Sequence, residues 1–342
     1  MPPRTAPSAT VCPHRRRAAL IAAGASALVA AIAQLTPGPA RAQANDKPLK
    51  IILPVGAGSG VDTIARAAQP ALIKALGGQP VIIENLPGAG GVTGASVLAK
   101  AAPDGLTIGI VSNNHVINPS VYKKMPFDTV EDFTEISVLG TTPMVLVVNP
   151  AKVPAKNAKE LVAFLKARPD AYNYASSGNG TVLHLAAELF VDEAGVPIRH
   201  IPYKGAGPMI ADLVGGQVEL GVLALPAIQG QLKNGSLRAI GVMSAKRNAA
   251  APDVPTFAEQ GMPGVEIEGW FAVIAPAKLP PAEVRRIHDA FVTAFNTAEV
   301  KEAMARQGND IHPSTPEAAA AFFRSEVARY AKLVKKANIT LD

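Results

Sequence analysis

The most constraining feature of the sequence is a short apolar run that meets three glycines and then a helical pattern. Residues 51–55 read as a buried strand, and apolar residues recur at helical spacing from Ile64 to Leu72. Glycines at such a turn let successive backbone N–H groups point into one concavity, and the following helix adds unpaired N–H groups and the positive end of its dipole. The turn therefore predicts either an anion-binding loop or a plain strand-to-helix connection.

The same order of strand and helix recurs along the chain. Expected strands cover residues 51–55, 81–84, 106–111, 144–149, 172–175, 198–201, 218–223 and 237–243. Expected helices cover residues 61–76, 91–101, 157–168, 181–194, 207–214, 226–233, 281–297 and 316–336. This alternation is typical of parallel α/β sheets. Pro70 breaks the pattern of the first helix, which we expect to be kinked or shortened there.

A second glycine-rich turn follows the second expected strand, over residues 85–94. Neither turn is a dinucleotide fingerprint, because Val61 and Thr93 occupy the place of its last glycine, and neither ends like a phosphate-binding loop. The third strand ends in the polar run 112–114, at the sheet edge where open α/β folds bind ligands. Ligand contact and simple turn or cap chemistry both fit these side chains.

A third polar turn lies in the second half of the chain, over residues 176–181, with Thr181 or Asn179 as the expected helix cap. His184 and Glu188 follow at i, i+4 spacing on that helix. A ligand contact and a structural hydrogen bond are the two interpretations of His184. Beyond the next strand, Lys204 is the one cation on any of these turns, and both a ligand contact and a solvated surface charge fit it.

The N-terminal segment has the features of an export signal. Three arginines, 15–17, precede the Ala-rich apolar stretch 18–33, and small residues around 40–44 offer cleavage sites. The apolar stretch is shorter than the roughly 20 residues that a spanning helix needs. We therefore expect residues 1–42 to be removed during export to the periplasm, and no stable membrane insertion.

Removing this segment changes the charge balance. The chain has 33 Lys and Arg against 27 Asp and Glu, and five of the arginines lie in residues 1–42. The processed chain would carry 28 basic and 27 acidic residues, so its charge gives no indication of a nucleic-acid partner. The single cysteine, Cys12, also lies in the signal, which excludes a disulfide and a thiolate metal site from the processed chain. We expect no metal and no cofactor.

A set of short segments runs in one order across nearly the whole processed chain. They are the glycine loop ending in Asp62, residues 85–94, 176–181 with His184, 202–205, 212–217, 237–239, 252–256 and 269–270. Together they resemble the substrate-binding receptors of tripartite tricarboxylate transporters, the Bug-type family. The resemblance implies a type II periplasmic binding protein: two α/β lobes joined by a hinge, with the ligand cleft between them. Residues 43–149 plus 269–342 would form lobe I, and residues 150–268 lobe II.

The resemblance also implies which residues bind the ligand. In such receptors backbone N–H groups and ordered water from the first lobe hold a ligand carboxylate, and the second lobe closes over the other end. Carried over to this chain, the ligand-binding residues are Gly56, Ala57, Gly58, Ser59, Gly60, Asp62, Pro87, Gly88, Ala89, Gly90, Gly91, Ser112, Asn113, Ser176, Ser177, Gly178, Thr181, His184, Tyr203 and Lys204. Within this set we expect Asp62 to cap its helix, because a bare carboxylate repels an anion.

The function implied is that of an extracytoplasmic receptor for a small carboxylate: a di- or tricarboxylate, a carboxylated amino acid or an aromatic acid. Its partners would be the ligand and, transiently, membrane permease subunits, with the receptor itself a monomer. Two alternatives stay open: an orphan sensor that feeds a signalling partner, and a periplasmic α/β hydrolase using Ser177 with a distant histidine. No Gly-x-Ser-x-Gly elbow or His-x-x-x-His pair is present, so we expect no enzymatic activity.

Overall fold

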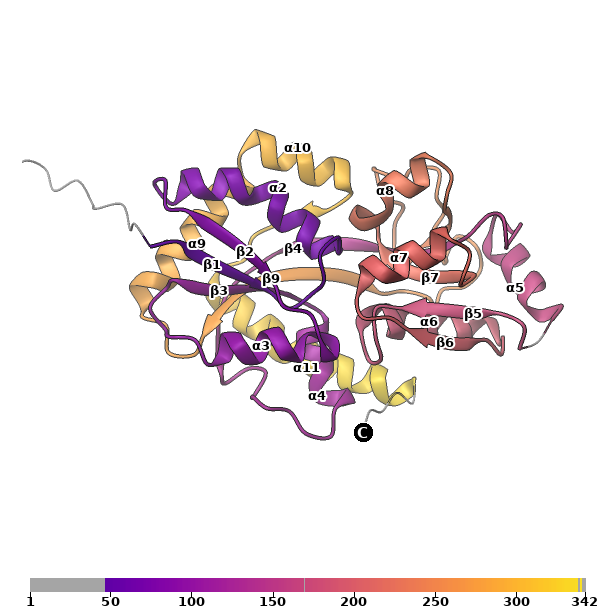
Figure 1. Cartoon of the computed structure of the whole chain (residues 1–342), viewed down its shortest axis with the longest axis horizontal. Coiled ribbons are helices and arrows are strands. Elements are labelled where there is room, and N and C mark those ends of the chain that lie inside the picture. The colour runs from indigo at the N-terminus through magenta and orange to yellow at the C-terminus, as the bar shows by residue number, and fades with distance from the viewer. Residues whose placement is uncertain (1–46, 169, 338, 340–342) are drawn as a thin grey trace, which may run out of the picture. The chain divides into compact units, whose positions relative to one another are not determined.

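The structure is a computed structural model that describes residues 47–168, 170–337 and 339 (Figure 1). The expected export signal at residues 1–42, its cleavage sites and Cys12 lie outside these residues. Over the described part of the chain, no helix combines the length and the apolar character needed to cross a bilayer.

Strands and helices alternate through most of the chain. The strands are β1 (Leu49–Leu53), β2 (Val81–Asn85), β3 (Thr107–Ser112), β4 (Phe133–Val148), β5 (Asn173–Ser176), β6 (Arg199–Pro202), β7 (Leu220–Ala224), β8 (Arg238–Val242), β9 (Glu268–Pro276) and β10 (Asp310–Ile311). The helices are α2 (Gly60–Ala75), a 3₁₀ turn η2 (Ala89–Gly91), α3 (Val92–Ala99), α4 (Asn114–Val121), α5 (Ala158–Lys166), α6 (Val182–Ala194), α7 (Ala206–Val214), α8 (Leu225–Lys233), α9 (Pro281–Phe295), α10 (Ala298–Gln307) and α11 (Pro316–Lys336).

Every expected helix is present to within a few residues, and so is every expected strand except β4, which begins at Phe133 and not near residue 144. The elements α4, α10, β9 and β10 were not foreseen. The α4 segment carries Pro119 and few apolar residues at helical spacing, so the sequence pattern did not predict this helix. Helix α2 continues for five residues beyond Pro70, so the expected shortening is wrong. Pro70 is exposed, and water can therefore satisfy the carbonyl that its missing N–H leaves unpaired.

The strands form one mixed sheet in the order β2-β1-β3-β9-β4-β7-β5-β6, with β8 and β10 also pairing with β4. Pairing is parallel among β1, β2 and β3 and among β5, β6 and β7. The long strands β4 and β9 are antiparallel to each other and to their other neighbours. The expectation of purely parallel sheets is therefore wrong at the centre, where β4 and β9 join the two parallel strand groups (Figure 1).

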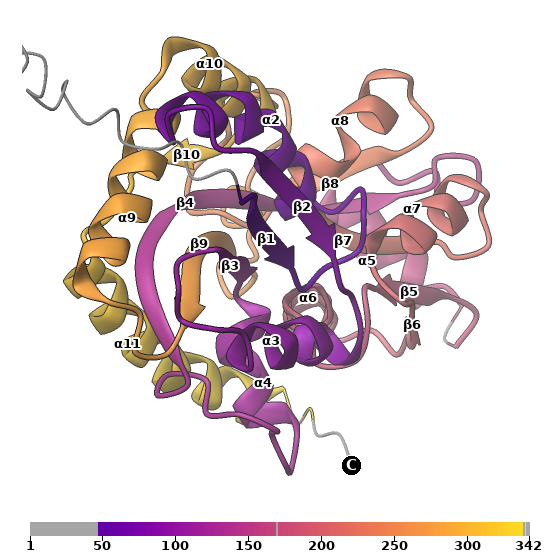
Figure 2. The ribbon, with the colours of Figure 1, turned by 60° about the vertical axis from the view of Figure 1, so that its left-hand side comes forward.

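Strand β4 runs through both parts of this junction. Its residues 133–143 pair with β9, and its residues 144–148 pair with β7 and β8. Register shifts interrupt the β4–β9 ladder near Glu135 and Val138, and such bulges bend a strand. Figure 2 shows β4 curving along the edge of the first group. The lobe boundaries expected at residues 149/150 and 268/269 stay a prediction.

Alternating side chains of the central strands build the core on both faces of the first group. Ile51 and Leu53 of β1 belong to the core that includes residues of α2 and α9, whereas Ile52 belongs to the core that includes residues of α3, α4 and α11. Figure 2 shows α2, α9 and α10 on one side of the strands and α3 and α4 on the other. Burial on both faces explains why the sequence reads as continuous apolar runs here.

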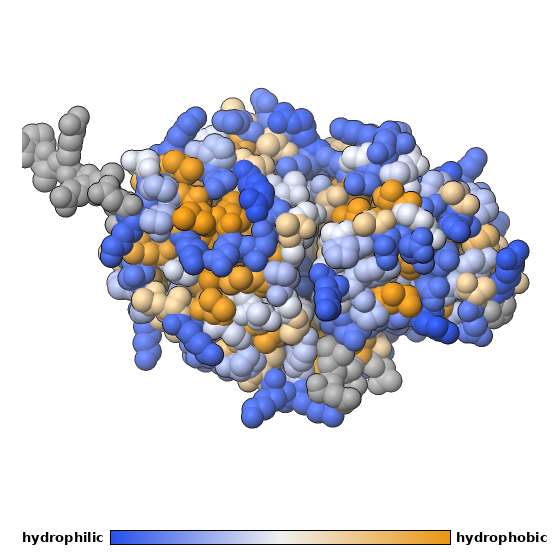
Figure 3. All heavy atoms as spheres, viewed as in Figure 1, coloured by the Kyte–Doolittle hydropathy of each residue, from blue (hydrophilic) through white to orange (hydrophobic). Residues whose placement is uncertain are grey.

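Apolar side chains also reach the surface. Figure 3 shows them gathered on the half of the molecule where β1, β2 and α3 lie. Ile82 on β2 and Val97 on α3 are each about half exposed, at 49% and 48%. The β2 strand is the outermost strand of its group, and the exposed ion pair between Lys50 and Glu84 lies beside it.

Candidate functional site

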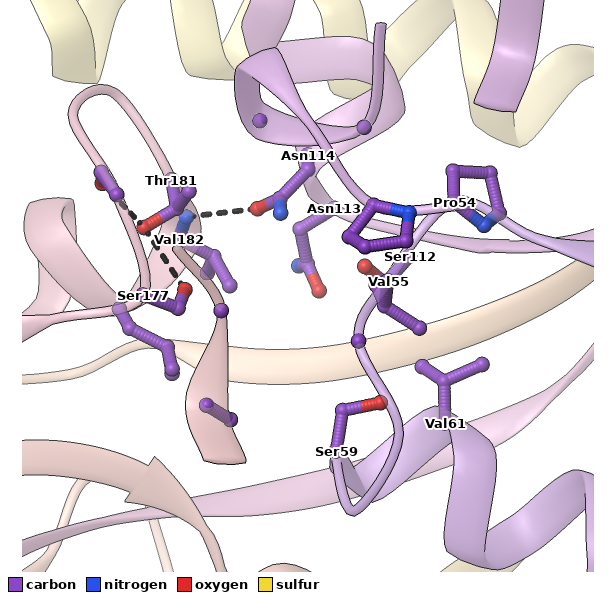
Figure 4. A pocket seen from close by; sticks show the side chains of 18 of the residues that line it. Pro54, Val55, Ser59, Val61, Ser112, Asn113, Asn114, Ser177, Thr181 and Val182 are labelled. Carbon is purple, nitrogen blue, oxygen red and sulfur yellow. Dashed lines mark hydrogen bonds between the residues drawn. The ribbon is translucent and has the colours of Figure 1, made fainter. Parts of the chain in front are cut away.

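A cavity of about 570 Å³ lies where the two strand groups face each other. Its first wall comes from the loops after β1, β2 and β3, and its second wall from the loops after β5, β6 and β7. The floor comes from β4 and β9. The first wall contains residues 54–56, 59–61, 87–91, 112–114 and Tyr122; the second contains residues 177–179, 181–183, 202–206, 223–224 and Ala227; the floor contains Thr142, Met144 and Trp270. Figure 4 shows Ser59 and Ser177 on opposite sides of this cavity.

The first glycine loop is fixed by side chains behind the cavity. Ser59 is the N-cap of α2 and accepts the backbone N–H of Asp62, so the expectation that Asp62 is the cap is wrong. The Asp62 carboxylate instead accepts the N–H of Gly58 at 3.0 Å and is paired with Arg66 at 2.9 Å. Asn85 donates to both Asp62 and the Val55 carbonyl, which ties the first loop to the second. These contacts hold the loop while leaving its cavity side uncharged.

The second glycine loop lies directly against the first. Gly91 has φ of 101°, and a Cβ on it would approach the Pro54 carbonyl to 3.1 Å. A Cβ on Gly94 would come within 2.9 Å of the Pro54 Cα. Only glycine combines this backbone conformation with this close approach. The two loops are therefore side by side at one edge of the sheet.

Helix N-termini converge on the cavity from both walls. The lining includes the N-cap or first-turn residues of α2, α3, α4, α6, α7 and α8. Side chains cap α2 and α6, but no side-chain cap is present at α3, α4, α7 or α8. At α3 the carbonyls of Gly88 and Ala89 accept first-turn N–H groups, whereas the uncapped starts of α4, α7 and α8 leave N–H groups for an anion. The aligned helix dipoles favour negative charge at this place.

The third polar turn is fixed by a buried cluster behind the second wall. The Ser176 hydroxyl lies 2.6 Å from Nε2 of His200, whose ring stacks on His184 at 3.8 Å between centroids. His184 accepts the N–H of Gly180 through Nδ1 at 3.0 Å. Burial, reinforced by the neighbouring His184, lowers the pKa of His200 to about 4, so this ring is neutral. Ser176 and His184 therefore shape the loop from behind.

The α6 helix begins at the cavity edge as expected from its cap. Thr181 is the N-cap and accepts the N–H of His184, which confirms one of the two residues expected there. The Ser177 hydroxyl donates to the Thr181 hydroxyl at 3.2 Å. No histidine bonds Ser177 among the described residues; the histidine contact belongs to Ser176, which is fully buried.

The turn after β6 brings the only charge to the cavity. Lys204 is the single lining residue of the described chain with a charged side chain, and it is exposed. Tyr203 donates its hydroxyl to Asp212 at 2.9 Å, and burial together with this carboxylate raises the pKa of Tyr203 to about 12. The Tyr203 hydroxyl is thus committed to the protein, and Lys204 is left as the available cation.

The two walls touch each other around the cavity. A Cβ on Gly60 would lie 2.8 Å from the Cβ of Ala224, and one on Gly207 would lie 3.3 Å from the Ala57 carbonyl. Asn114 accepts the N–H of Val182 at 2.8 Å across the cavity (Figure 4). These contacts describe a closed arrangement of the walls.

Most of the residues expected to bind ligand line this cavity. Those in the lining are Gly56, Ser59, Gly60, Pro87, Gly88, Ala89, Gly90, Gly91, Ser112, Asn113, Ser177, Gly178, Thr181, Tyr203 and Lys204. The others lie outside it: Ala57, Gly58, Asp62, Ser176 and His184. Gly58 has open space around it and φ of 77°, so the loop needs it for backbone conformation.

Sequence reasoning missed the floor and part of the second wall. Ala224 is the last residue of β7 and Ala227 follows in α8. Their position was a usable signal, because ligands bind at the carboxyl ends of parallel strands. Thr142 and Met144 lie in the middle of an apolar strand and carry no local signal.

Comparison with known proteins identifies the family. The family profile described as "Tripartite tricarboxylate transporter family receptor" matches residues 64–339. The chain belongs to this family. Protein BugT of Bordetella pertussis is 35% identical over 297 residues, covering 86% of this chain and 90% of that protein.

Solved structures of similar proteins agree with this family assignment. Periplasmic binding protein BugD is 31% identical with a TM-score of 0.82, and the match covers 86% of this chain and 99% of that one. The R. palustris protein Rpa4515, solved with adipate, is 32% identical with a TM-score of 0.82, covering 86% and 98%. The fold class expected from the sequence, a two-lobed periplasmic binding protein, is confirmed. Relatives in the tripartite tricarboxylate transporter receptor family are binding proteins, some of them solved with small carboxylates.

Proposed function

We propose that this chain is an extracytoplasmic receptor that captures a small organic carboxylate between its two lobes and delivers it to a tripartite tricarboxylate-type permease. The convergence of helix N-termini on a cavity that carries one lysine and no acidic side chain supports this proposal best. Donors of this kind stabilise an anion without a matching number of cations. The family membership and the adipate complex of Rpa4515 agree with a carboxylate ligand.

In the proposed mechanism, both lobes contact the ligand and closure follows from the added contacts. The glycine loops of the first wall present N–H groups, and Lys204 with the uncapped α7 N-terminus presents charge from the second. A ligand shifts an open–closed equilibrium only by the free energy of contacts that exist in the closed form. Contacts such as that between Gly60 and Ala224 exist only when the walls meet, and a permease could recognise that state.

This mechanism needs no covalent step, and we propose that the protein is not an enzyme. The hydrolase alternative required an accessible Ser177 activated by a histidine, whereas Ser177 donates to Thr181. The Ser176–His200 pair has the short distance of a nucleophile and base, but Ser176 is 0% exposed and lies outside the cavity lining.

The test is a melting-temperature screen of the chain without residues 1–42 against mono-, di- and tricarboxylates, followed by calorimetry on those that raise the melting temperature. A ligand that binds only the folded protein must raise the melting temperature. At a concentration 100 times the dissociation constant, such a ligand adds about 2.7 kcal/mol to the free energy of unfolding. Replacing Lys204 with Met should weaken binding, whereas Lys233→Met, at the C-terminal end of α8 and outside the cavity lining, serves as a matched control. A melting temperature that no carboxylate raises, together with turnover of a chromogenic ester, would contradict the receptor function.

Localisation has its own test. We propose that the export signal directs the protein to the periplasm, since the charged n-region, apolar stretch and small-residue sites of residues 1–42 follow the signal pattern. Mass spectrometry of the protein recovered from an osmotic-shock fraction should show an N-terminus close to residue 43. Retention of the full-length chain in the cytosolic fraction would count against it.

A further inference from the structure

The floor of the cavity holds a polar group that the protein itself does not satisfy. Thr142 lies on β4, lines the cavity and is only 4% exposed. Its hydroxyl Oγ1 is buried and has no hydrogen-bond partner within the described chain. Leaving a buried hydroxyl unpaired costs about 1–3 kcal/mol, so such a group needs an explanation.

The other residues of the floor, Met144 and Trp270, are apolar except for the indole N–H of Trp270, which already donates to Glu326. The lining contributed by β4, β7 and α8 consists of Thr142, Met144, Leu223, Ala224 and Ala227, and Thr142 alone among them is polar. The methyl group of Thr142 packs over Gly269 of the paired strand, beside the terminal methyl of Met144. Thr142, with its unpaired hydroxyl, is therefore the polar member of an otherwise apolar group of lining residues.

No cation lies on this floor. Lys204 is the one charged side chain of the described lining, and it follows β6, which is three strands away from β4 in the order β4-β7-β5-β6. At about 4.8 Å per strand the two backbones are roughly 14 Å apart. The glycine loop after β1 is also three strands away from β4, on the opposite side. Anion-holding groups thus belong to the walls, and the floor offers a neutral hydrogen bond.

We propose that Thr142 contacts the ligand and determines specificity, and that the preferred ligand is a carboxylate carrying an uncharged oxygen, a hydroxyl or a carbonyl, at its end remote from the carboxylate. The proposal rests on the receptor function above. A second carboxylate at the floor would lose its hydration without gaining a counter-charge, which is unfavourable. A hydroxyl or carbonyl would pair with Oγ1 and remove the unpaired group.

The test uses matched probes that share one carboxylate and one carbon skeleton. Suitable triplets are butyrate, 4-hydroxybutyrate and succinate; hexanoate, 6-hydroxyhexanoate and adipate; and benzoate, 4-hydroxybenzoate and terephthalate. Dissociation constants are measured by calorimetry for the wild type, Thr142→Val and Thr142→Ser. Valine keeps the shape and removes the hydroxyl, whereas serine keeps the hydroxyl.

In at least one triplet the wild type should bind the hydroxylated member about tenfold more tightly than the monocarboxylate that has no oxygen at its remote end. Thr142→Val should abolish that preference and leave the other two members within about twofold of the wild type, and Thr142→Ser should preserve it. The melting temperature of unliganded Thr142→Val should not fall, because the substitution removes an unpaired buried hydroxyl. If Thr142 had a purely structural role, its replacement by valine would lower the melting temperature.

Four outcomes would overturn the inference. If Thr142→Val weakens the binding of all members of a triplet equally, Thr142 has a structural role. If the wild type does not prefer the hydroxylated member, Thr142 does not select the ligand. A preference for the dicarboxylate that depends on Thr142 would reverse the chemistry proposed. Failure of every probe to bind the wild type would overturn the receptor proposal as well. This outcome is distinguishable from binding whose affinity does not change on substitution of Thr142, which overturns only the present inference.

Discussion

Asn114 at the start of α4 accepts a hydrogen bond from the backbone N–H of Val182, the first residue of α6, over 2.8 Å. The two residues come from opposite walls of the cavity (Figure 4). The bond satisfies one of the N–H groups that a helix N-terminus leaves unpaired, but the acceptor belongs to the other strand group. The cap of α6 is therefore complete only when the walls meet, which links a local requirement of one helix to closure of the cleft.

Asn114→Ala should weaken binding of a carboxylate found in the melting-temperature screen by about fivefold, because one cross-wall hydrogen bond contributes about 1 kcal/mol to the closed form. Calorimetry measures the change. Asn179→Ala, which removes an amide from the second wall without touching this bond, is the control and should alter affinity less. Equal affinities for Asn114→Ala and the wild type would show that the contact does not stabilise the closed form.

Gly60→Ala should weaken carboxylate binding about tenfold or more, because its Cβ would lie 2.8 Å from the Cβ of Ala224 across the closed cleft. The same change should maintain or raise the stability of the unliganded protein, since alanine is the better helix former by about 1 kcal/mol. Adding Ala224→Gly removes the opposing methyl and should restore binding. If the double variant binds no better than Gly60→Ala, the contact between the walls is not the cause.

Acid should destabilise the fold through His115, which is buried among Phe127, Phe133 and Phe323. Burial lowers its pKa from 6.5 to about 4, against a smaller opposite effect of its hydrogen bond to the Thr129 carbonyl. The unfolded chain therefore binds a proton between these values that the folded chain does not. Stability contributed by neutral His115 is complete above about pH 6.5 and is lost progressively as the pH falls toward about 4.

Urea unfolding at about pH 7.5 and about pH 5 should show a loss of about 2 kcal/mol from this histidine. His115→Gln cannot titrate but can still donate to Thr129, and so should have a smaller loss over the same range. The pH dependence of stability that remains in His115→Gln includes the contribution of His200, whose pKa is also lowered. A wild type whose stability rises on acidification would contradict the assigned sign.

Trp270 should depend on Glu326 for its place beside the cavity. The indole N–H donates to the buried Glu326 carboxylate at 2.9 Å, and the Trp270 backbone N–H donates to Asn113 at 3.0 Å. Glu326→Ala should lower the free energy of unfolding by about 1–3 kcal/mol, because it leaves the indole N–H unpaired. Glu326→Gln keeps an acceptor and should cost less. Since the chain has one tryptophan, its emission during urea unfolding reports on this site directly.

The sequence could predict the strand-to-helix turns because their signals are local. A buried apolar run, a glycine cluster and a helical period occur within about a dozen residues around Gly56 and again around Gly90. Parallel strands bring such turns to one sheet edge whatever the detailed packing, so most residues expected at the site do line the cavity.

The sequence could not separate the residues that face the cavity from those that support it. Asp62 and His184 occupy the expected loops but point to the neighbouring loop backbone, where their hydrogen bonds fix the turn. Both kinds of role use the same polar residue types at the same positions, so only the geometry of the folded loops distinguishes them.

What the sequence by itself determined is the α/β pattern, the glycine turns and the excess of backbone donors over charges at the site. These follow from periodicity and residue type over short stretches. The tertiary structure alone decided that β4 and β9 join the strand groups, that Thr142, whose hydroxyl is unpaired, lies in the floor, and that Asn114 completes the cap of α6. Each of these joins residues distant in sequence, and contacts of that kind are fixed by packing of the whole chain and have no local pattern.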